Sequence, residues 1–434
     1  MLRSPILLLA ATAGICLPAQ QVADGYAQTT ATLPAGAGSF LETTFGTVYF
    51  DGFDLMLDPG TGGTSLLTFP SFTFGSFSAP IGATEVLFGE SSNGGIWTVP
   101  LNGLPAQLVA NVPFNYDAVL LDDDRALVSA KTGGFSAPDN DVMFVDLLTG
   151  QTQLLAQFPG ASGPLAIDAN GDVYYATSPA VFPAPAGTVE VLRLPRAVVD
   201  LAISNQTVLG VADATVVIAG LDAAGDLAFD DDGDLFFVDW FNGTIGEVDG
   251  ADGGQATLAP TLIDYAGTGL SGSVLQFAPT AAPVPQVFEP FQPAGAALLV
   301  HETDYVSISQ VRSLVAAPPQ LSASAASPIP AGVFTLDTTG GPATGLGLLL
   351  FAPATGLGPV TLSVPGFEQP LFVDGALAPA PVILPISFDA AGHASFPVTN
   401  PGFAQAFDAI AQTVVVSTSG AIGASAALPL QVGQ

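Results

Sequence analysis

The sequence predicts an all-β protein in which a β-propeller of about six four-stranded blades precedes a small antiparallel β-sandwich. Three observations lead to this fold class: the composition, a repeat of roughly 44 residues, and a change of pattern after residue 330. Apolar residues make up 49% of the 434 residues and charged residues only 10%, with 49 Gly and 37 Pro. Such a composition implies frequent turns and few long amphipathic helices, which favours strands.

The repeat is clearest between residues 54–69 and 141–158. In both, an apolar strand ends at an aspartate (Asp58, Asp146), a Thr-Gly turn follows, and a second apolar strand begins. Similar pairs of strands are predicted at residues 96–112, 188–203, 244–258 and, more faintly, 305–315. The regular spacing predicts one structural unit that recurs along the chain.

A short strand with paired large apolar residues precedes most of these pairs. The copies are Val48-Tyr49-Phe50, Val86-Leu87-Phe88, Val173-Tyr174-Tyr175, Leu235-Phe236-Phe237, Leu298-Leu299-Val300 and the weaker Ala126-Leu127-Val128. Each period therefore holds four strands, and the sheets must stack around an axis to bury both faces. This predicts six blades, or seven if residues 206–222 form a degenerate blade rather than an insertion.

The predicted domain order follows from these patterns. The propeller is expected over residues 40–315, and the Pro-, Ala- and Ser-rich residues 316–330 suit a linker. Residues 331–434 contain short predicted strands with turn signals every 10 to 15 residues or so, the rhythm of a β-sandwich.

The N-terminus predicts export. Arg3 precedes an apolar run over residues 6–17, and Leu17-Pro18-Ala19 resembles a cleavage site, so residues 1–19 are predicted to be a secretory signal. No later segment approaches 18 uninterrupted apolar residues, and we expect no membrane span in the mature chain. The predicted location is extracytoplasmic: secreted, periplasmic or at the cell surface.

The charge balance excludes some partners. There are 38 Asp plus Glu against six Lys plus Arg, for a formal net charge of −32. A chain this acidic repels phosphate backbones and anionic lipids, so nucleic acid is not an expected partner. The expected partner is a protein or carbohydrate ligand.

Residues 226–249 resemble the NHL-type propeller repeat. An apolar strand ends at Asp230, a Gly turn leads to a strand ending in Val238-Asp239, and a turn at Asn242 precedes the last strand. Residues 163–177 match the first half of this pattern. The resemblance implies a propeller of the kind commonly used as a binding platform, and some similar proteins are lactonases or lyases. Activity does not follow from the fold alone.

Three acidic turns share the spacing Asp-x-x-Gly-Asp and begin at Asp168, Asp222 and Asp230. Carboxylates are the ligands that calcium prefers, which makes a calcium site possible in the richest turn. Its candidate ligands are Asp230, Asp231, Asp232 and Asp234. The alternative, which we favour, is a tight hairpin in which Gly supplies a positive φ angle and Asp caps the turn. No other cofactor is expected.

Catalytic signals are few. His301 lies beside Glu302 and Asp304, which could orient it as a general base, although a polar residue ending a strand is more often exposed at an edge. A propeller enzyme would need channel carboxylates around a divalent metal, for which Glu90, Asp168 and Asp239 are the candidates.

Exposed aromatic residues are the better binding candidates. Trp240 and Phe241 lie in a predicted loop after a strand, where their rings could stack on a ligand. We therefore predict an exported, non-enzymatic binding or cell-surface-associated protein built on a propeller. The alternative is a lactonase- or lyase-like propeller enzyme with a divalent metal in its central channel.

Overall fold

The computed structural model describes residues 21–179, 185–253, 256–279, 287–291, 296–353, 382–401, 407–417 and 421–432. The predicted signal, residues 1–19, lies outside these residues, as do the sandwich strands expected at residues 359–366 and 371–379. In the described part of the chain, no helix has both the length and the hydrophobicity needed to cross a membrane.

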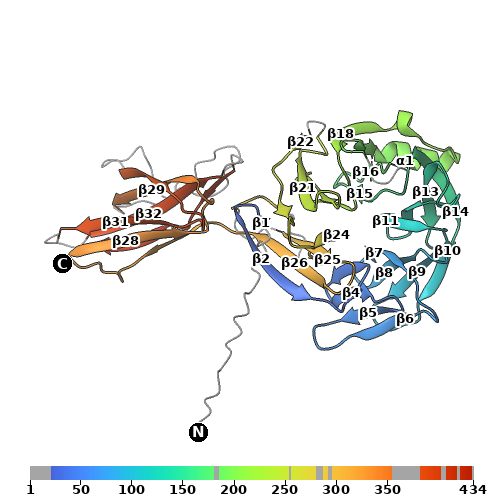
Figure 1. Cartoon of the computed structure of the whole chain (residues 1–434), viewed down its shortest axis with the longest axis horizontal. Helices are drawn as coiled ribbons and strands as arrows, with labels where there is room; N and C mark the ends of the chain where they lie inside the picture. The colour runs from blue at the N-terminus through green and yellow to red at the C-terminus, as the bar shows by residue number, and fades with distance from the viewer. Residues whose placement is uncertain are drawn as a thin grey trace, which may run out of the picture.

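The all-β propeller is confirmed, with six antiparallel sheets arranged in a ring (Figure 1). The first blade contains β3 (Phe40–Thr43), β4 (Gly46–Phe50), β5 (Asp54–Asp58) and β6 (Thr64–Thr68). The second contains β7 (Gly75–Ile81), β8 (Glu85–Glu90), β9 (Gly95–Pro100) and β10 (Gln107–Asn111). The third contains β11 (Asn115–Asp122), β12 (Arg125–Ala130), β13 (Asp139–Asp146) and β14 (Thr152–Pro159).

The remaining three blades are less regular. The fourth contains β15 (Leu165–Ile167), β16 (Val173–Ala176), β17 (Val189–Leu194) and β18 (Thr215–Leu221). The fifth contains β19 (Leu227–Phe229), β20 (Leu235–Asp239), β21 (Thr244–Asp249), β22 (Thr257–Leu258), β23 (Ile263–Asp264) and β1 (Gln21–Val22). The sixth contains β24 (Ser271–Phe277), β25 (Ala297–Thr303), β26 (Ser309–Ala316) and β2 (Tyr26–Thr32).

The first strand of each blade lies nearest the axis. Each of these inner strands contacts the inner strand of the next blade, and β24 contacts β3, which completes the ring. The second strands carry the paired large residues recognised in the sequence, and these are buried between neighbouring blades. Phe50 and Phe88, for example, come from adjacent blades and pack with their ring centroids 5.1 Å apart.

Strand β2, from the N-terminal part of the chain, forms the outer strand of the sixth blade and so closes the ring. All seven of its residues pair with β26, from Tyr26 opposite Ala316 to Thr32 opposite Gln310. Strand β1 similarly extends the fifth blade by pairing with β23. The expected pair of strands at residues 305–315 is therefore wrong, since this segment is the single strand β26 and its outer neighbour comes from the N-terminus.

The fourth blade also differs from expectation. Only the first half of residues 188–203 is a strand, because Pro195 has no N–H for the sheet and precedes helix α1 (Arg196–Asn205). Val199 and Ala202 bury one side of α1 in the core shared with the third blade. After the short 3₁₀ turn η1 (Val211–Asp213), residues 215–221 form β18, so residues 206–222 complete the fourth blade and are no seventh blade.

The C-terminal part packs two sheets against each other. One contains β27 (Gln320–Ala323), β28 (Gly332–Thr339) and β31 (Ala394–Asn400). The other contains β30 (Val382–Ser387), β29 (Leu346–Pro353), β32 (Phe407–Val416), β33 (Ile422–Ala424) and β34 (Leu428–Val432). Their shared core includes Phe334, Leu349 and Phe388. Strand β27 lies inside residues 316–330, where we expected a linker, and pairs with β28.

Removing β2 tests the closure of the ring. A chain that lacks residues 21–33 leaves the outer edge of β26 unpaired, and we expect its melting temperature to fall by about 5 °C or more. Circular dichroism against temperature measures the change. An unchanged melting temperature would show that β2 contributes nothing to the stability of the propeller.

Candidate functional site

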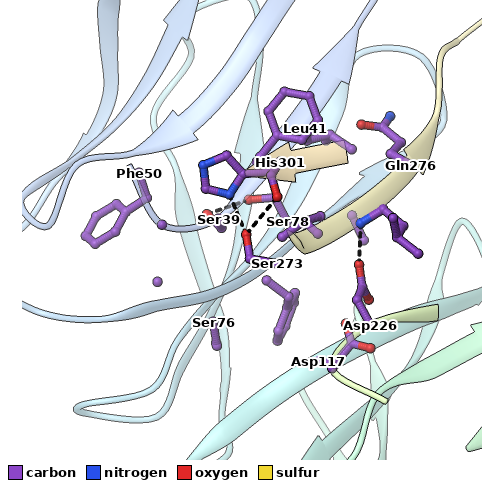
Figure 2. A pocket seen from close by; sticks show the side chains of 18 of the residues that line it. Ser39, Leu41, Phe50, Ser76, Ser78, Asp117, Asp226, Ser273, Gln276 and His301 are labelled. Atoms are coloured by element: carbon purple, nitrogen blue, oxygen red, sulfur yellow. Dashed lines mark hydrogen bonds between the residues drawn. The ribbon is translucent and has the colours of Figure 1, made fainter. Parts of the chain in front are cut away.

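A cavity of about 900 Å³ lies where the inner strands of the six blades converge (Figure 2). Its walls are formed mainly by β3, β7, β11, β15, β19 and β24 with the residues that precede them. Volumes of this size suit small organic ligands. The cavity is therefore the leading candidate for a functional site.

A β-bulge at the start of the inner strands shapes the cavity wall. Gly38 and Ser39 both pair with Phe50, and Gly225 and Asp226 both pair with Val238. In β7, β11 and β24 the register with the second strand shifts at the same point. A bulge re-aims a side chain, and the residues at these bulges that line the cavity are Ser39, Ser76, Tyr116, Asp226 and Ser273.

Two aspartates, Asp117 and Asp226, share the cavity. The Tyr116 hydroxyl donates a 2.8 Å hydrogen bond to the carbonyl oxygen of Gly225, which ties the bulges of the third and fifth blades together. Figure 2 shows the two carboxyl groups near each other, with Asp226 accepting a 2.6 Å bond from the backbone N–H of Leu275. Asp117 accepts bonds from the backbone N–H groups of Leu165, at 2.7 Å, and Ala118, at 2.8 Å. Backbone groups thus hold both carboxyls in place.

Burial raises the pKa of both carboxyls, and repulsion between them contributes to the shift of Asp226. Burial raises the pKa of Asp117 to about 6. The pKa of Asp226 is raised well above its ordinary value, first by burial and then by the negative charge of Asp117. When two carboxyls share one site, they retain a proton between them at a pH where isolated carboxyls have lost theirs.

The described lysine and arginine side chains do not neutralise the pair, because all are engaged elsewhere. Their partners are Asp122 and Asp200 for Arg125, Asp172 for Arg193, Asp200 for Arg196, Glu302 for Arg312, and three carbonyl oxygens for Lys131. A third carboxylate, Asp51, lines the cavity and caps its own turn. The cavity is thus acidic, without a Lys or Arg among its described lining residues.

Aromatic side chains add to the lining. Those that are more than a third exposed are Phe72, Phe74, Tyr116, Trp240 and Tyr305. All five lie in or beside the segments that precede the inner strands or follow the second strands, which places them on one face of the ring. Of the two aromatic residues expected to bind a ligand, Trp240 lines the cavity, and Phe241 packs against it with ring centroids 6.3 Å apart.

His301 lies inside the cavity wall, although its position near the end of a strand suggested an exposed edge. It is only 1% exposed, because β25 is covered by β24 and β26 on either side. Its Nδ1 lies 2.6 Å from Ser273 Oγ and its Nε2 lies 2.8 Å from Ser309 Oγ. Burial lowers the pKa of His301 to about 4, so the ring is neutral at physiological pH.

The sequence neighbours of His301 do not orient its ring. Glu302 is paired with Arg312, and Asp304 accepts three backbone N–H bonds within its own turn. The two serines that do contact the ring are 28 and 8 residues away along the chain. Strand pairing between β24, β25 and β26 brings them together, which no local sequence signal could reveal.

The three carboxylates suggested for a channel metal do not converge. Glu90, Asp168 and Asp239 are buried, and none of them lines the cavity. Each accepts hydrogen bonds from backbone N–H groups two to four residues ahead, at Asn93 for Glu90, Asn170 and Asp172 for Asp168, and Phe241 and Asn242 for Asp239. Their role is to cap turns at strand ends.

The acidic turn from Asp230 to Asp234 lies on the fifth blade between β19 and β20. Asp230 accepts backbone N–H bonds from Asp232, Asp234 and Phe288, which is the turn-capping role that the hairpin interpretation expects. Gly233 supplies the positive φ angle, at 92°. Asp231 is exposed and is not part of the carboxylate groupings described next.

Asp232 and Asp234 do meet other acids. The carboxylates of Asp232, Asp234 and Glu289 have oxygens within 4.8 Å of one another, and so do those of Asp234, Glu247 and Asp249. Burial first, and the neighbouring carboxylates second, raise the pKa of Asp234 to about 6, of Glu289 to about 7 and of Glu247 to about 9. These oxygens are the hard donors that calcium accepts, so the residues fit the ion. Calcium binding here stays a prediction.

Comparison with known proteins finds likeness in structure only. No family model matches the chain, and no curated protein matches it in sequence. Similar solved structures include the calcium-binding protein regucalcin from Agrobacterium tumefaciens, with 14% identity over 69% of this chain and 95% of that one, at a TM-score of 0.44. A gluconolactonase from Xanthomonas campestris has 14% identity over 68% and 94%, at 0.45. Virginiamycin B lyase from Staphylococcus aureus has 12% identity over 67% and 99%, at 0.41.

These neighbours are β-propeller proteins. At such identities and TM-scores, the activities in their names carry no argument for this chain. The NHL-type resemblance of residues 226–249 likewise stays a prediction.

The acid cluster of the fifth blade has a clear expected pH dependence. Because the folded pKa values of Asp234, Glu289 and Glu247 are raised, the native state binds more protons than the unfolded chain above roughly pH 4. The free energy of unfolding is therefore expected to fall as the pH rises from roughly 4 to roughly 9, the folded pKa of Glu247. Urea denaturation at several pH values measures it.

Calcium should reverse this loss if the cluster binds the ion. We expect millimolar calcium to raise the melting temperature at pH 7.5, EDTA to remove the effect, and Asp234→Asn to abolish it. Asp408→Asn, at an exposed position on the sandwich, is the matched control and should keep the response. An equal calcium response in both variants would contradict a site at the cluster.

Proposed function

We propose that the propeller is a binding module that takes a small organic cation, an amine or ammonium compound, into its axial cavity. The observation that carries the proposal is the carboxyl pair Asp117 and Asp226, which faces the cavity without a protein cation among the described residues. A positively charged ligand supplies the missing counter-charge. As an exported protein, the chain would meet such ligands outside the cytoplasm.

The energetics favour a cation over a neutral ligand. One unit charge 4 Å from another is stabilised by about 4 kcal/mol at the effective dielectric constant of a protein surface. Burial raises the pKa of both carboxyls, and the negative charge of Asp117 raises that of Asp226 further, so a positively charged group beside the pair favours its ionised form. The backbone N–H groups that hold the two carboxyls keep this charge in place before the ligand arrives.

The aromatic lining suits the same ligand. The faces of Trp, Tyr and Phe rings attract ammonium groups, by about 0.5 to 2 kcal/mol per contact. Trp240, Tyr116 and Tyr305 offer such rings along the path to the carboxyl pair. The formal net charge of −32 raises the local concentration of cations around the whole molecule.

The alternative of an enzyme with a divalent metal in its channel has no matching ligand set in the cavity. A lactonase- or lyase-like propeller with a divalent metal needs several ligands around one ion in the channel. Among the described residues, the groups of three acids that can share an ion lie on the fifth blade, outside the cavity lining. The acids described in the cavity lining are Asp51, Asp117 and Asp226, and they are not among the groups of three that can share an ion.

Calorimetry with matched probes tests the proposal. We expect benzylamine and benzyltrimethylammonium to bind, and the neutral benzyl alcohol to bind at least about tenfold more weakly, a difference of 1.4 kcal/mol or more. Asp117→Asn and Asp226→Asn should each weaken binding of the cations, whereas Asp408→Asn should not. Equal affinity for benzylamine and benzyl alcohol would contradict the proposal.

The affinity should also depend on pH in a defined direction. A cation binds best when Asp117 is ionised, and the pKa of that carboxyl is raised to about 6. We therefore expect benzyltrimethylammonium, whose charge does not titrate, to bind about tenfold more tightly at pH 7.5 than at pH 5. Asp117→Asn should flatten the profile, and a profile that stays steep in this variant would assign the titration to another group.

A further inference from the structure

We propose that the cavity also carries out acyl transfer, with Ser273 as the nucleophile and His301 as its general base, on small carboxylic esters. The proposal goes beyond cation binding and does not depend on it, because it rests on different side chains of the same cavity. Neither residue stands in a catalytic motif recognisable in the sequence.

The contact between the two side chains is direct. Ser273 Oγ lies 2.6 Å from His301 Nδ1, within the range at which a general base removes a hydroxyl proton (Figure 2). Both residues line the cavity, so a substrate there can reach the hydroxyl. Ser273 lies at the bulge of β24, where the ladder with β25 skips from Gly272 to Val274. The bulge thus places the hydroxyl beside the histidine one strand away.

Two further groups hold the imidazole ring. Ser309 Oγ lies 2.8 Å from Nε2 of His301. The ring of Phe40 stacks on the imidazole at a centroid distance of 6.1 Å. In the reactive tautomer, the proton is on Nε2 and is donated to Ser309, which leaves the lone pair of Nδ1 facing Ser273. Ser309 is a positioning residue in this scheme, in the place that an acid occupies in hydrolases of the Ser-His-Asp type.

The reaction balances with water as the second substrate. Ser273 Oγ attacks the ester carbonyl carbon while its proton passes to His301 Nδ1. The bond between that carbon and the alkoxy oxygen breaks, and the alcohol leaves with the proton from Nδ1. Water, deprotonated by Nδ1, then attacks the acyl-serine, and the proton returns to Ser273 as the carboxylic acid is released. No metal, oxidant or reductant is needed.

The ionisation of His301 sets the pH range over which its ring can accept a proton. Burial lowers its pKa to about 4, so the ring is neutral and able to accept a proton at any pH above roughly 5. Glu302, whose charge opposes this shift, points to Arg312 instead. Acylation should therefore lose rate only below about pH 5, unlike the cation affinity expected to change near pH 6.

A fluorophosphonate tests the nucleophile directly. We expect diisopropyl fluorophosphate to phosphorylate the folded full-length chain once, at Ser273, as read by intact mass and peptide mapping. Ser273→Ala should lose the adduct, and His301→Gln should slow its formation by about a hundredfold or more. Ser78→Ala is the matched control, a cavity serine whose hydroxyl bonds Ser39 rather than a histidine, and should be labelled like the parent chain.

The outcomes separate this inference from the proposed function. Hydrolysis of p-nitrophenyl acetate that is lost in Ser273→Ala and kept in Asp408→Asn, which lies on the sandwich outside the cavity, would support the nucleophile. No adduct on the folded parent chain, or an adduct that persists in Ser273→Ala, would overturn it whether or not the cations bind. An unchanged labelling rate in His301→Gln would remove the histidine from the mechanism.

Discussion

The pairing of β2 with β26 is the constraint on which the rest of the propeller depends. Six blades form a ring only if the last blade meets the first, and here the N-terminal strand supplies the outer edge of the sixth blade. The inner strands can then converge on one axis, and the bulges at their starts aim polar side chains into a shared cavity. A ring that stayed open at this point would separate β24 from β3, and with it the walls of the site.

The basic and acidic side chains of the propeller are distributed differently. The few described basic side chains are used within the blades, where they pair with carboxylates or donate hydrogen bonds to carbonyl oxygens. Acids with raised pKa values include Asp117 and Asp226 in the cavity and Glu247 on the fifth blade. Such carboxyls destabilise the folded chain near neutral pH. Their retention at two defined places is easiest to explain by ligands that compensate them.

Much of the fold was predictable because it is encoded locally. The repeated strand and turn patterns gave the blade type and the count of six, and the buried pairs such as Phe50 and Phe88 lie where the repeat placed them. Two features were not predictable, for physical reasons. Helix α1 replaces an expected strand after Pro195, and β2 finds its partner more than 280 residues away, a contact that no local pattern records.

The site was harder to predict than the fold. Trp240 was singled out and lies at the cavity. The turn from Asp230 to Asp234 was favoured as a capped hairpin, and the acids that meet it from elsewhere in the chain were not indicated by the sequence. The suggested channel ligands Glu90, Asp168 and Asp239 cap turns instead. No sequence motif marks Asp117, Asp226 or Ser273 as a site residue. A bulge shifts the alternation of a strand by one residue, and without knowing where the bulges fall, inward-facing and outward-facing positions cannot be told apart.

The ring closure also determines how late in synthesis the hydrogen bonds of β2 can form. Because β2 is made first and its partner β26 ends at residue 316, the first strand must wait unpaired while almost three hundred residues are added. A nascent propeller of this design has an open edge throughout elongation, and it acquires its full hydrogen-bond ladder only when the last blade emerges. If the chain is exported as its N-terminus predicts, it must cross a membrane before it is fully folded. The late pairing of β2 keeps the ring open during that step, and the ring can close once export is complete.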